Sequence, residues 1–246
     1  MKAAYVFDVD GTLTPSRQLI TDEFRDFFMQ FALEHDVYLI SGSDYVKTVE
    51  QLGEVIVNDL VLRSYNCSGN SIWEKGVEIY ANDWVLPDAG KNHLTDRLLG
   101  SKCPTKTSNH FEYRPGTVNF STVGRNANTE QRAEYVKFDN ETGERKSIVE
   151  SFNTYFGIRL NCVAHIGGET GIDITQVGHD KRQLLLPPHG YPQDIFENTH
   201  IHFFGDKTEA GGNDWPLAQA ISSNDCGTVY QVAGWRDTMD QLQTLT

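Results

Sequence analysis

The chain reads Phe7-Asp8-Val9-Asp10-Gly11-Thr12-Leu13-Thr14 directly after a short apolar run that begins at Ala3. The apolar run predicts a buried strand, so Asp8 and Asp10 leave its end two residues apart and can enter one pocket. Gly11 lets the backbone turn sharply behind them. A carboxylate can form an aspartyl-phosphate when a metal ion neutralises both it and the phosphate, and a second carboxylate can then carry the hydroxyl proton. The stretch therefore favours phosphoryl transfer, although an isolated pair of this kind can also be a plain acidic loop.

The residues after this stretch predict a helix. Thr21 can cap the helix, and acidic residues occupy its first turn. Four phenylalanines then recur at the spacing of one buried helical face: Phe24, Phe27, Phe28 and Phe31. A stripe of this kind is far more often core than a ligand site.

A second strand and helix follow. Val37 to Ile40 predicts the strand, Asp44 can cap the helix, and Gly53 fits its C-terminal end. The inward residues of that helix would be Val46 and Val49. Leu60 to Leu62 predicts a third strand. Strands that alternate with helices form a parallel sheet, which binds ligands at the carboxyl ends of its strands.

The middle of the chain does not continue the alternation of strands and helices. Pro115 and Gly116 predict a turn between antiparallel strands. The elements expected there are helices at 129–138 and 144–156 and strands at 158–164 and 171–175. Beyond Asp180 the expected elements are strands at 201–204 and 228–232 and helices at 213–221 and 236–244. The sequence therefore predicts an α/β fold. A Rossmann-like parallel-sheet core of residues 1–81 and 180–246 carries an inserted α+β cap domain at 82–179.

Composition excludes several classes of protein. The chain has 246 residues, of which 39% are hydrophobic and 22% charged, and this usage argues against a disordered protein. Its formal net charge is −13, the opposite of what the phosphates of nucleic acid require of a partner. We therefore expect no binding to nucleic acid.

No apolar run reaches the roughly 20 residues that span a bilayer, and Asp8 interrupts the first apolar run before a signal peptide could form. We expect a cytoplasmic protein without membrane contact. The cysteines lie far apart and are expected to be free thiols, namely Cys67, Cys103, Cys162 and Cys226.

Three later segments place complementary groups at the ends of other predicted strands. Ser41 and Ser43 lie where the second strand meets a helix N-terminus, whose free N–H groups suit a phosphate. Lys181 supplies a cation that can offset the charge between a nucleophile and a phosphoryl group. Another strand end offers hard oxygen ligands for Mg²⁺, namely Asp206, Asn213 and Asp214. Each residue alone can be a cap, a surface charge or a turn former, but their order at successive strand ends favours one site.

This order of motifs resembles the haloacid dehalogenase superfamily of phosphotransferases over the predicted core. The resemblance implies that Asp8 is the phosphorylated nucleophile and Asp10 the general acid/base. It implies that Ser41, or less favourably Ser43, binds the phosphate together with Lys181. The implied Mg²⁺ ligands are Asp206, Asp8 and the carbonyl of Asp10.

The predicted cap carries a second set of motifs. Residues 112–121, with the 123–125 and 130–132 segments, resemble the cap of eukaryotic-type phosphomannomutases, and the likeness runs over nearly the whole chain. It implies that three arginines bind the substrate phosphate that does not react: Arg114, Arg125 and Arg132. It also implies that Arg17 positions the sugar phosphate and that Asp173 holds sugar hydroxyls.

The chemistry of a mutase agrees with this resemblance. A mutase binds a hexose bisphosphate by either end and needs a second phosphate site, and guanidinium groups bind phosphate oxygens bidentately. The alternative is that some of these arginines form ordinary surface ion pairs.

Three residues and one segment depart from the family pattern. Gly171, at a substrate-binding position, replaces a serine and so lacks a hydroxyl that would touch sugar or phosphate. Glu169 places a carboxylate where a neutral amide is usual, and Ser41 replaces a glycine, as in the general phosphatase pattern. No acid occurs in residues 215–220, which argues against a second cation site.

These observations predict a Mg²⁺-dependent phosphomannomutase that interconverts mannose 6-phosphate and mannose 1-phosphate for GDP-mannose synthesis, with a hexose 1,6-bisphosphate as activator. The alternative is a sugar-phosphate phosphatase of the same superfamily, favoured by Ser41, Glu169 and Gly171. A non-catalytic sugar-phosphate-binding protein is disfavoured because the motif residues are intact. The resemblance also implies a homodimer through the cap and a cap that closes to exclude water.

Overall fold

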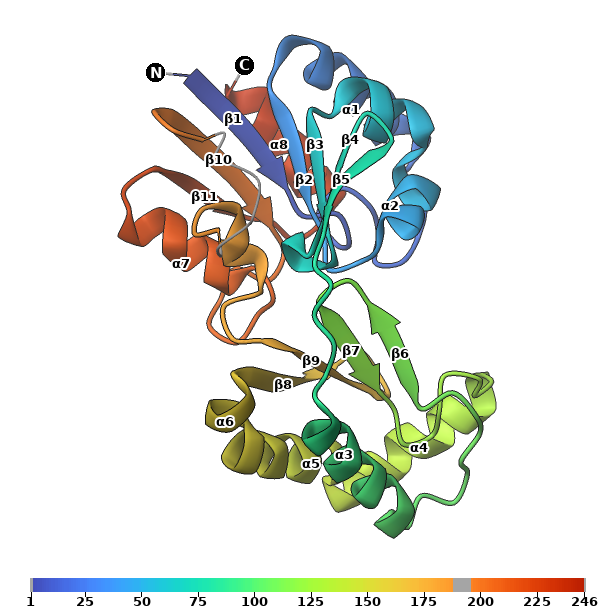
Figure 1. The fold of residues 1–246 in the computed structure, drawn as a ribbon. Helices are drawn as coiled ribbons and strands as arrows, with labels where there is room; N and C mark the ends of the chain where they lie inside the picture. Colours follow the sequence, from blue (N-terminus) through green and yellow to red (C-terminus); the bar gives the residue numbers. More distant parts are fainter. Residues whose placement is uncertain (1, 188–195, 246) are drawn as a thin grey trace. The chain divides into compact units, whose positions relative to one another are not determined.

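The computed structural model describes residues 2–187 and 196–245 of the chain. It divides into two compact units, Met1–Asn82 with Gly178–Thr246, and Asp83–Val177 (Figure 1). The division expected from the sequence, 81/82 and 179/180, lies within two residues of these bounds. In the described part of the chain, no helix is both long enough and apolar enough to cross a membrane.

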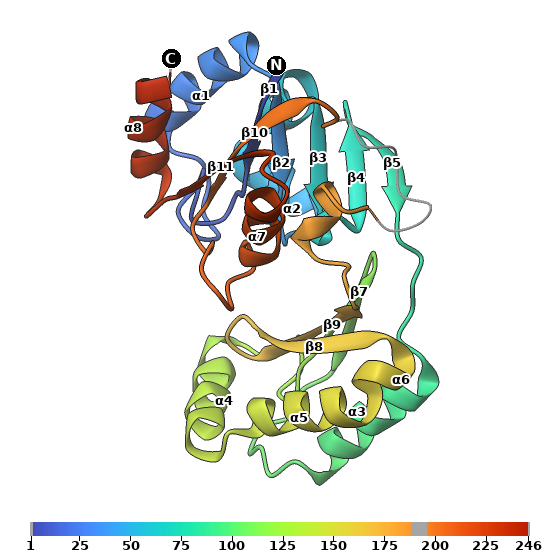
Figure 2. The same cartoon turned by 90° about the vertical axis from the view of Figure 1, so that its left-hand side faces the viewer.

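The first unit is built on a seven-stranded sheet with the order β11-β10-β1-β2-β3-β4-β5 (Figure 2). Its strands are β1 (Lys2–Phe7), β2 (Val37–Ile40), β3 (Arg63–Asn66), β4 (Ser71–Glu74), β5 (Val77–Ala81), β10 (Thr199–Gly205) and β11 (Gly227–Gln231). The first five in spatial order pair in parallel, and β4 and β5 add an antiparallel hairpin. The chain leaves β1 for β2 on one side and reaches β10 on the other, so the strand order reverses beside β1, where open α/β sheets bind ligands.

Helices cover both faces of this sheet, which confirms the predicted α/β fold. They are α1 (Asp22–Glu34), α2 (Tyr45–Leu52), α7 (Trp215–Ser223) and α8 (Trp235–Leu245). Side chains alternate along β1, because Tyr5 and Phe7 join the core under α1 and α8, whereas Ala4 and Val6 join the core under α7.

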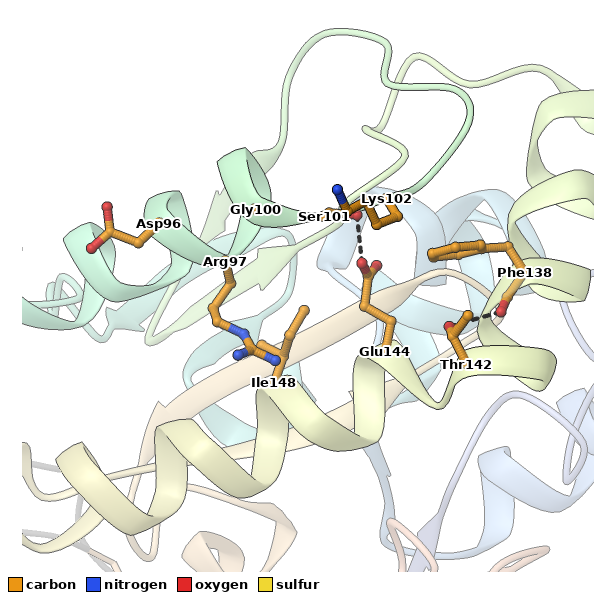
Figure 3. A pocket seen from close by; sticks show the side chains of 9 residues that line it. All are labelled: Asp96, Arg97, Gly100, Ser101, Lys102, Phe138, Thr142, Glu144 and Ile148. Carbon is orange, nitrogen blue, oxygen red and sulfur yellow. Dashed lines mark hydrogen bonds between the residues drawn. The ribbon is translucent and has the colours of Figure 1, made fainter.

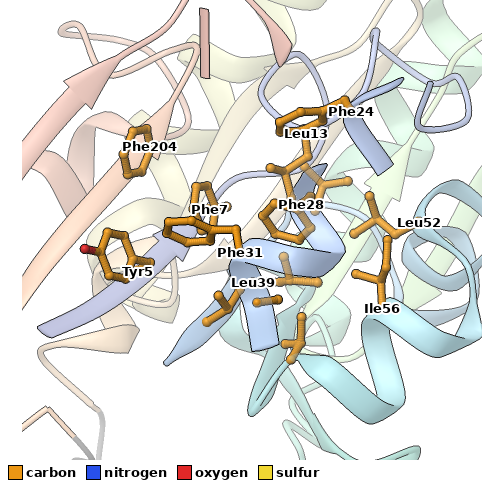
Figure 4. Packing of buried hydrophobic residues seen from close by; sticks show 14 of the residues in the cluster. Tyr5, Phe7, Leu13, Phe24, Phe28, Phe31, Leu39, Leu52, Ile56 and Phe204 are labelled. Carbon is orange, nitrogen blue, oxygen red and sulfur yellow. The ribbon is translucent and has the colours of Figure 1, made fainter. Parts of the chain in front are cut away.

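The phenylalanine stripe of α1 is core, as predicted. Phe24 and Phe28 are fully buried and Phe31 nearly so, while Phe27 packs at the edge of the same cluster. The Phe28 ring meets Phe7 edge to face with ring centroids 5.3 Å apart (Figure 4). This packing fixes the strand that delivers Asp8.

Three local expectations for this unit are wrong or incomplete. Residues 55–60 form a π-helical segment and the third strand begins only at Arg63, since a short apolar run cannot by itself distinguish strand from buried helix. Val46 is exposed rather than inward. Asp44 does cap α2, accepting from the Lys47 amide, but Thr21 makes no capping hydrogen bond.

The second unit is a four-stranded antiparallel sheet of order β6-β7-β9-β8 with helices packed on one face. Its strands are β6 (Phe111–Arg114), β7 (Thr117–Phe120), β8 (Cys162–Gly167) and β9 (Gly171–Gln176). Its helices are α3 (Asp88–Gly100), α4 (Thr129–Thr142), α5 (Glu144–Phe152) and the short α6 (Ile158–Leu160). Alternate residues of β7 and β9 therefore present apolar side chains to the helices and polar ones, such as Asn119 and Asp173, to the other face.

The α+β character of this unit agrees with the sequence analysis, but a strand expected at 158–164 begins only at Cys162. Residues 158–160 are helical and the Ile158 side chain is almost fully exposed, so its hydrophobicity does not mark core. The helix expected at 144–156 ends at Phe152 and continues as a π-helical turn, Asn153–Gly157. The four cysteines are free, as expected.

The Phe28→Ala substitution should lower the free energy of unfolding by about 3–5 kcal/mol, because it leaves a cavity against Phe7 in a core that cannot collapse fully. Urea unfolding followed by circular dichroism measures this loss. Phe27→Ala is the matched control on the same helix, and its loss should be clearly smaller because that ring is only partly buried. Equal losses would mean that the stripe does not face the core as described.

Candidate active site

Three carboxylates meet at the carboxyl edge of the parallel sheet. Asp8 follows β1, Asp206 follows β10, and Asp214 immediately precedes α7. One carboxylate oxygen from each lies within 4.8 Å of the others. Asp8 and Asp214 are buried, and Asp206 is partly exposed.

The ammonium group of Lys181 lies between two of these carboxylates. Lys181 Nζ is 2.5 Å from Asp8 Oδ1 and 2.6 Å from Asp214 Oδ1. The Lys181 side chain is fully buried, at the start of a 3₁₀ turn that Asp180 caps through the Arg182 amide. A buried charge of this kind is tolerated only when it is paired, so the pairing sets the geometry of the site.

Charge and burial oppose one another in this cluster. Burial raises the pKa of Asp8 to about 7, although Lys181 lowers it, and Asp214 raises it further. Burial would lower the pKa of Lys181, but Asp214 and Asp8 outweigh it and raise that pKa. Burial also raises the pKa of Asp206. Three carboxylates against one ammonium leave an excess of negative charge on hard oxygen ligands, which fits a divalent cation such as Mg²⁺.

Two glycines allow these carboxylates to approach the backbone. Gly11 has a φ of 84°, and a Cβ there would lie 2.6 Å from Asp206 Oδ2. A Cβ on Gly205 would lie 2.8 Å from Asp214 Oδ2, which accepts a hydrogen bond from the Lys207 amide. Side chains at these two positions would displace the carboxylates, so the glycines are required for packing as well as for the turn.

Asp10 lies in a different environment from Asp8. Its Oδ1 accepts from the Arg17 amide at 2.6 Å and from Gln51 Nε2 at 2.9 Å. Its Oδ2 accepts from the Ser43 hydroxyl at 3.2 Å. Asp10 is therefore held by hydrogen-bond donors and partly accessible, whereas Asp8 is buried against a lysine.

The other residues expected near the phosphate lie on the same edge of the sheet. Ser41 is buried, and its hydroxyl accepts from the Ser43 amide at 3.0 Å. Arg17 is exposed and reaches Asp10 through its backbone, which has a φ of 60°. Asn213 is exposed, and its amide nitrogen would lie 4.0 Å from a Cβ on Gly42.

Two of the predicted phosphate-binding arginines share one carboxylate in the second unit. Arg114 donates to Glu112 Oε1 from Nε at 2.8 Å and Nη2 at 2.6 Å, and Arg125 Nε donates to Glu112 Oε2. Burial raises the pKa of Glu112, but hydrogen bonds from Arg114 and the charges of both arginines outweigh it, so the pKa lies below its usual value. Two guanidinium groups are thus held together with one excess positive charge.

The remaining predicted cap residues lie nearby in this unit's sheet and α4. Arg132 Nη2 lies 3.2 Å from Glu169 Oε2, so this arginine pairs with the carboxylate that departs from the family pattern. Asp173 accepts from Asn119 Nδ2 at 2.7 Å. A Cβ on Gly171 would lie 2.5 Å from the same Asn119 nitrogen, which explains why a small residue stands there.

Sequence reasoning missed Gln51, Glu112 and Thr12 as part of this arrangement. Thr12 Oγ1 contacts Asp8 Oδ2 at 3.4 Å, and Gln51 reaches Asp10 across 41 positions of sequence. The one signal for Gln51 in the sequence is that a polar residue stands at a position on the inward face of a predicted helix. Arg114 follows Glu112 by two residues on β6, so alternation along the strand already places the two side chains on one face. The contact of Arg125 with Glu112 spans 13 positions and depends on a loop path that no local pattern encodes.

A family model described as eukaryotic phosphomannomutase matches residues 24–246. The chain belongs to that family. It is 33% identical over 253 residues to a probable phosphomannomutase of Caenorhabditis elegans, with 98% of this chain and 94% of that protein covered. It is also 33% identical over 228 residues to phosphomannomutase 1 of Homo sapiens, with 86% and 81% covered. The chain is an enzyme of the phosphomannomutase type, as its motifs predicted.

Solved structures show the same fold at low sequence identity. A haloacid dehalogenase-like hydrolase from Bacteroides thetaiotaomicron aligns with a TM-score of 0.63 at 14% identity over the whole of both chains. A trehalose-6-phosphate phosphatase related protein aligns with a TM-score of 0.60 at 14% identity, over 99% of this chain and 96% of that one. The predicted haloacid dehalogenase-like fold is confirmed.

A cavity of about 270 Å³ lies elsewhere in the second unit (Figure 3). Nine described residues line it: Asp96, Arg97, Gly100, Ser101, Lys102, Phe138, Thr142, Glu144 and Ile148. None of the site residues expected from the sequence is among them. The cavity is therefore separate from the arginine cluster around Glu112.

The Lys181→Met substitution should lower the free energy of unfolding by about 3–5 kcal/mol, because it leaves two buried carboxylates without their cation. The loss should grow as pH rises through about 7, the wild-type pKa to which burial raises Asp8. Without Lys181, which lowers that pKa, Asp8 in the variant stays protonated to a higher pH, and protonation relieves the unpaired charge. Urea unfolding without divalent metal measures both effects. Lys207→Met is the control, because its exposed contact to Asp206 at 3.8 Å should contribute less than about 1 kcal/mol. A loss as small as that of the control would contradict the pairing.

Glu112→Gln should lower the free energy of unfolding by an amount that depends on pH. The pKa of Glu112 is lower in the folded protein than the value of 4.5 for the unfolded chain, so the ionised carboxylate stabilises the fold at pH values above 4.5. This contribution is lost as the pH falls through the folded-state pKa of Glu112. The stability difference between wild type and variant should thus be largest above pH 4.5 and shrink below it. Urea unfolding across an acidic pH series measures this difference. Glu150→Gln, at an exposed ion pair, serves as control and should change the free energy of unfolding by less than about 1 kcal/mol.

Proposed function

We propose that the protein is a Mg²⁺-dependent phosphomannomutase that interconverts mannose 6-phosphate and mannose 1-phosphate through an aspartyl-phosphate on Asp8. The observation that carries the proposal is the buried Asp8 carboxylate, paired with Lys181 at the end of β1, in a chain of the phosphomannomutase family. A hexose 1,6-bisphosphate is the proposed donor that first phosphorylates Asp8, and the product would enter GDP-mannose synthesis.

The residues of the first unit can divide the chemistry among themselves. Asp8 attacks the phosphorus, and the Lys181 ammonium offsets the charge of the approaching phosphate. Asp10 gives a proton to the leaving sugar oxygen and takes one from the attacking hydroxyl. The different surroundings of the two carboxylates, one buried on a lysine and one held by hydrogen-bond donors, support this division.

The proposed Mg²⁺ ligands are Asp8, Asp206 and Asp214, with the Asp10 carbonyl. The three carboxylates are grouped within 4.8 Å and exceed the single ammonium in charge. A cation bound there would neutralise charge on the phosphate oxygens, because a negatively charged carboxylate is otherwise repelled by the phosphate it attacks. Asp214 already accepts from Lys181 and from the Lys207 amide, so we assign it the additional role of orienting Lys181.

Substrate recognition is proposed for the second unit. Arg114, Arg125 and Arg132 would bind the phosphate that is not transferred, and Asp173 would bind sugar hydroxyls. The excess positive charge around Glu112 supports this, because guanidinium groups remain charged and donate bidentately to phosphate. A homodimer through this unit is a further proposal that sedimentation velocity can test.

A sugar-phosphate phosphatase is the alternative. Its support is the Arg132–Glu169 ion pair, since a carboxylate there reduces the positive charge available to a second phosphate. Water would then be the usual acceptor of the phosphoryl group on Asp8.

Incubation of the protein with Mg²⁺, mannose 1-phosphate and a trace of glucose 1,6-bisphosphate, followed by ³¹P NMR, decides between the two. A mutase gives mannose 6-phosphate with little free phosphate. Asp8→Asn should abolish all turnover because the nucleophile is gone, and a chelator should stop the wild type reversibly.

Free phosphate without mannose 6-phosphate would support the phosphatase hypothesis instead. Turnover retained by Asp8→Asn would overturn the nucleophile assignment, and activity unchanged by the chelator would overturn the metal assignment. The three outcomes are separable because each comes from its own sample, namely the wild type, the variant and the wild type with chelator, and each spectrum reports both products.

A further inference from the structure

We propose that Gln51 is a positioning residue that fixes Asp10 so that its Oδ2 oxygen, and not Oδ1, carries the transferred proton. The inference rests on the proposed acid/base role of Asp10. It goes beyond that role by assigning the proton to one oxygen and its placement to a residue of α2.

The orientation of the Gln51 amide is determined by its surroundings. Gln51 lies in the last turn of α2 with 1% of its surface exposed. Its Nε2 is 2.9 Å from Asp10 Oδ1 and 3.2 Å from the carbonyl oxygen of Gln18. A carbonyl oxygen only accepts hydrogen bonds, so the group that faces it must be the NH₂ of the amide. Gln51 therefore donates to Asp10.

The two oxygens of Asp10 consequently differ in what they can do. Oδ1 faces two N–H donors, Gln51 and the Arg17 amide, and a proton on that oxygen would point at another hydrogen. Oδ2 faces the Ser43 hydroxyl, which can donate to a carboxylate and accept from a carboxylic acid. Only Oδ2 has surroundings that suit both protonation states.

The transfer step can be written for this geometry. The bond between phosphorus and the sugar oxygen breaks, the bond between phosphorus and an Asp8 oxygen forms, and the proton on Asp10 Oδ2 passes to the sugar oxygen. In the reverse direction Asp10 Oδ2 takes the proton of the attacking sugar hydroxyl as that oxygen bonds to phosphorus. Asp10 Oδ1 keeps its two hydrogen bonds throughout.

Gln51 stabilises the loop after β1, since its Nε2 also faces Thr14 Oγ1 at 3.2 Å, but the same side chain carries a cost that stability alone does not explain. Its Oε1 is buried and has no hydrogen-bond partner in the described part of the chain. A buried acceptor without a partner is unfavourable, and an apolar side chain of similar size would remove it. The Gln51 backbone carbonyl, which accepts from the Ile20 amide, would be unaffected by such a change.

The test compares two leaving groups in single turnovers with enzyme in excess. With p-nitrophenyl phosphate, phosphoryl transfer to Asp8 releases nitrophenolate, which leaves as a stable anion and needs no proton. With glucose 1,6-bisphosphate, the leaving sugar oxygen needs the proton of Asp10. Gln51→Met should slow transfer from the sugar by about 10- to 100-fold, a part of what a general acid contributes, while leaving nitrophenolate release within about threefold.

Gln183→Met is the matched control. Gln183 is equally buried, its Nε2 donates to the Ser68 carbonyl at 2.9 Å, and its Oε1 also lacks a partner among the described residues. Its two rates should change by the same factor. Gln51→Leu, of different shape, provides a second variant if the methionine variant unfolds, as thermal melts would show.

Equal slowing of both reactions in the Gln51 variants would overturn the proposal and leave Gln51 a structural residue. Unchanged rates for both would overturn it as well. Failure of the proposed function is distinguishable, because the wild type itself would then not be phosphorylated by glucose 1,6-bisphosphate.

Discussion

The burial of Lys181 between Asp8 and Asp214 is the contact on which the site of the first unit depends. A lysine without any exposed side-chain surface requires paired charges, and these come from segments 173 and 33 positions away in the sequence. The end of β1, the turn at residue 181 and the start of α7 must therefore meet at one point. Gly205 permits it, because any side chain there would contact Asp214.

The same sheet edge gives Asp8 and Asp10 different environments although they are two residues apart. Asp8 leaves β1 into the buried cluster, and the left-handed backbone at Gly11 packs against Asp206. Asp10 turns toward α2 and the loop that contains Arg17, where its side chain accepts from three hydrogen-bond donors. Two carboxylates in unlike surroundings can take unlike roles, and this separation is what phosphoryl transfer through an aspartate requires.

In the second unit, acidic partners hold the cationic side chains in place. Glu112 joins Arg114 and Arg125, and Glu169 contacts Arg132. The departure at Gly171 has a packing explanation, because Asn119 donates to Asp173 from the space that a larger side chain would fill. Ion pairs and the Asn119 amide thus hold the polar face of this sheet. Gly171 removes one hydroxyl group that the family pattern has there.

The sequence by itself determined the α/β class, the phenylalanine core of α1, the α+β insert, and the residues Asp8, Lys181, Asp206 and Asp214 as members of one site. These follow from local signals, since periodicity reports burial and a strand followed by acids reports a sheet edge. Only the tertiary structure decided the position of β3 and the helical turn at 158–160. It also decided which residues reach Asp10 from α2, and that Arg125 reaches Glu112. Short apolar runs are compatible with strand or helix, and a hydrogen bond between residues 10 and 51 exists only once β1 and α2 are packed. Long-range packing, which no local pattern encodes, sets which donor reaches which oxygen.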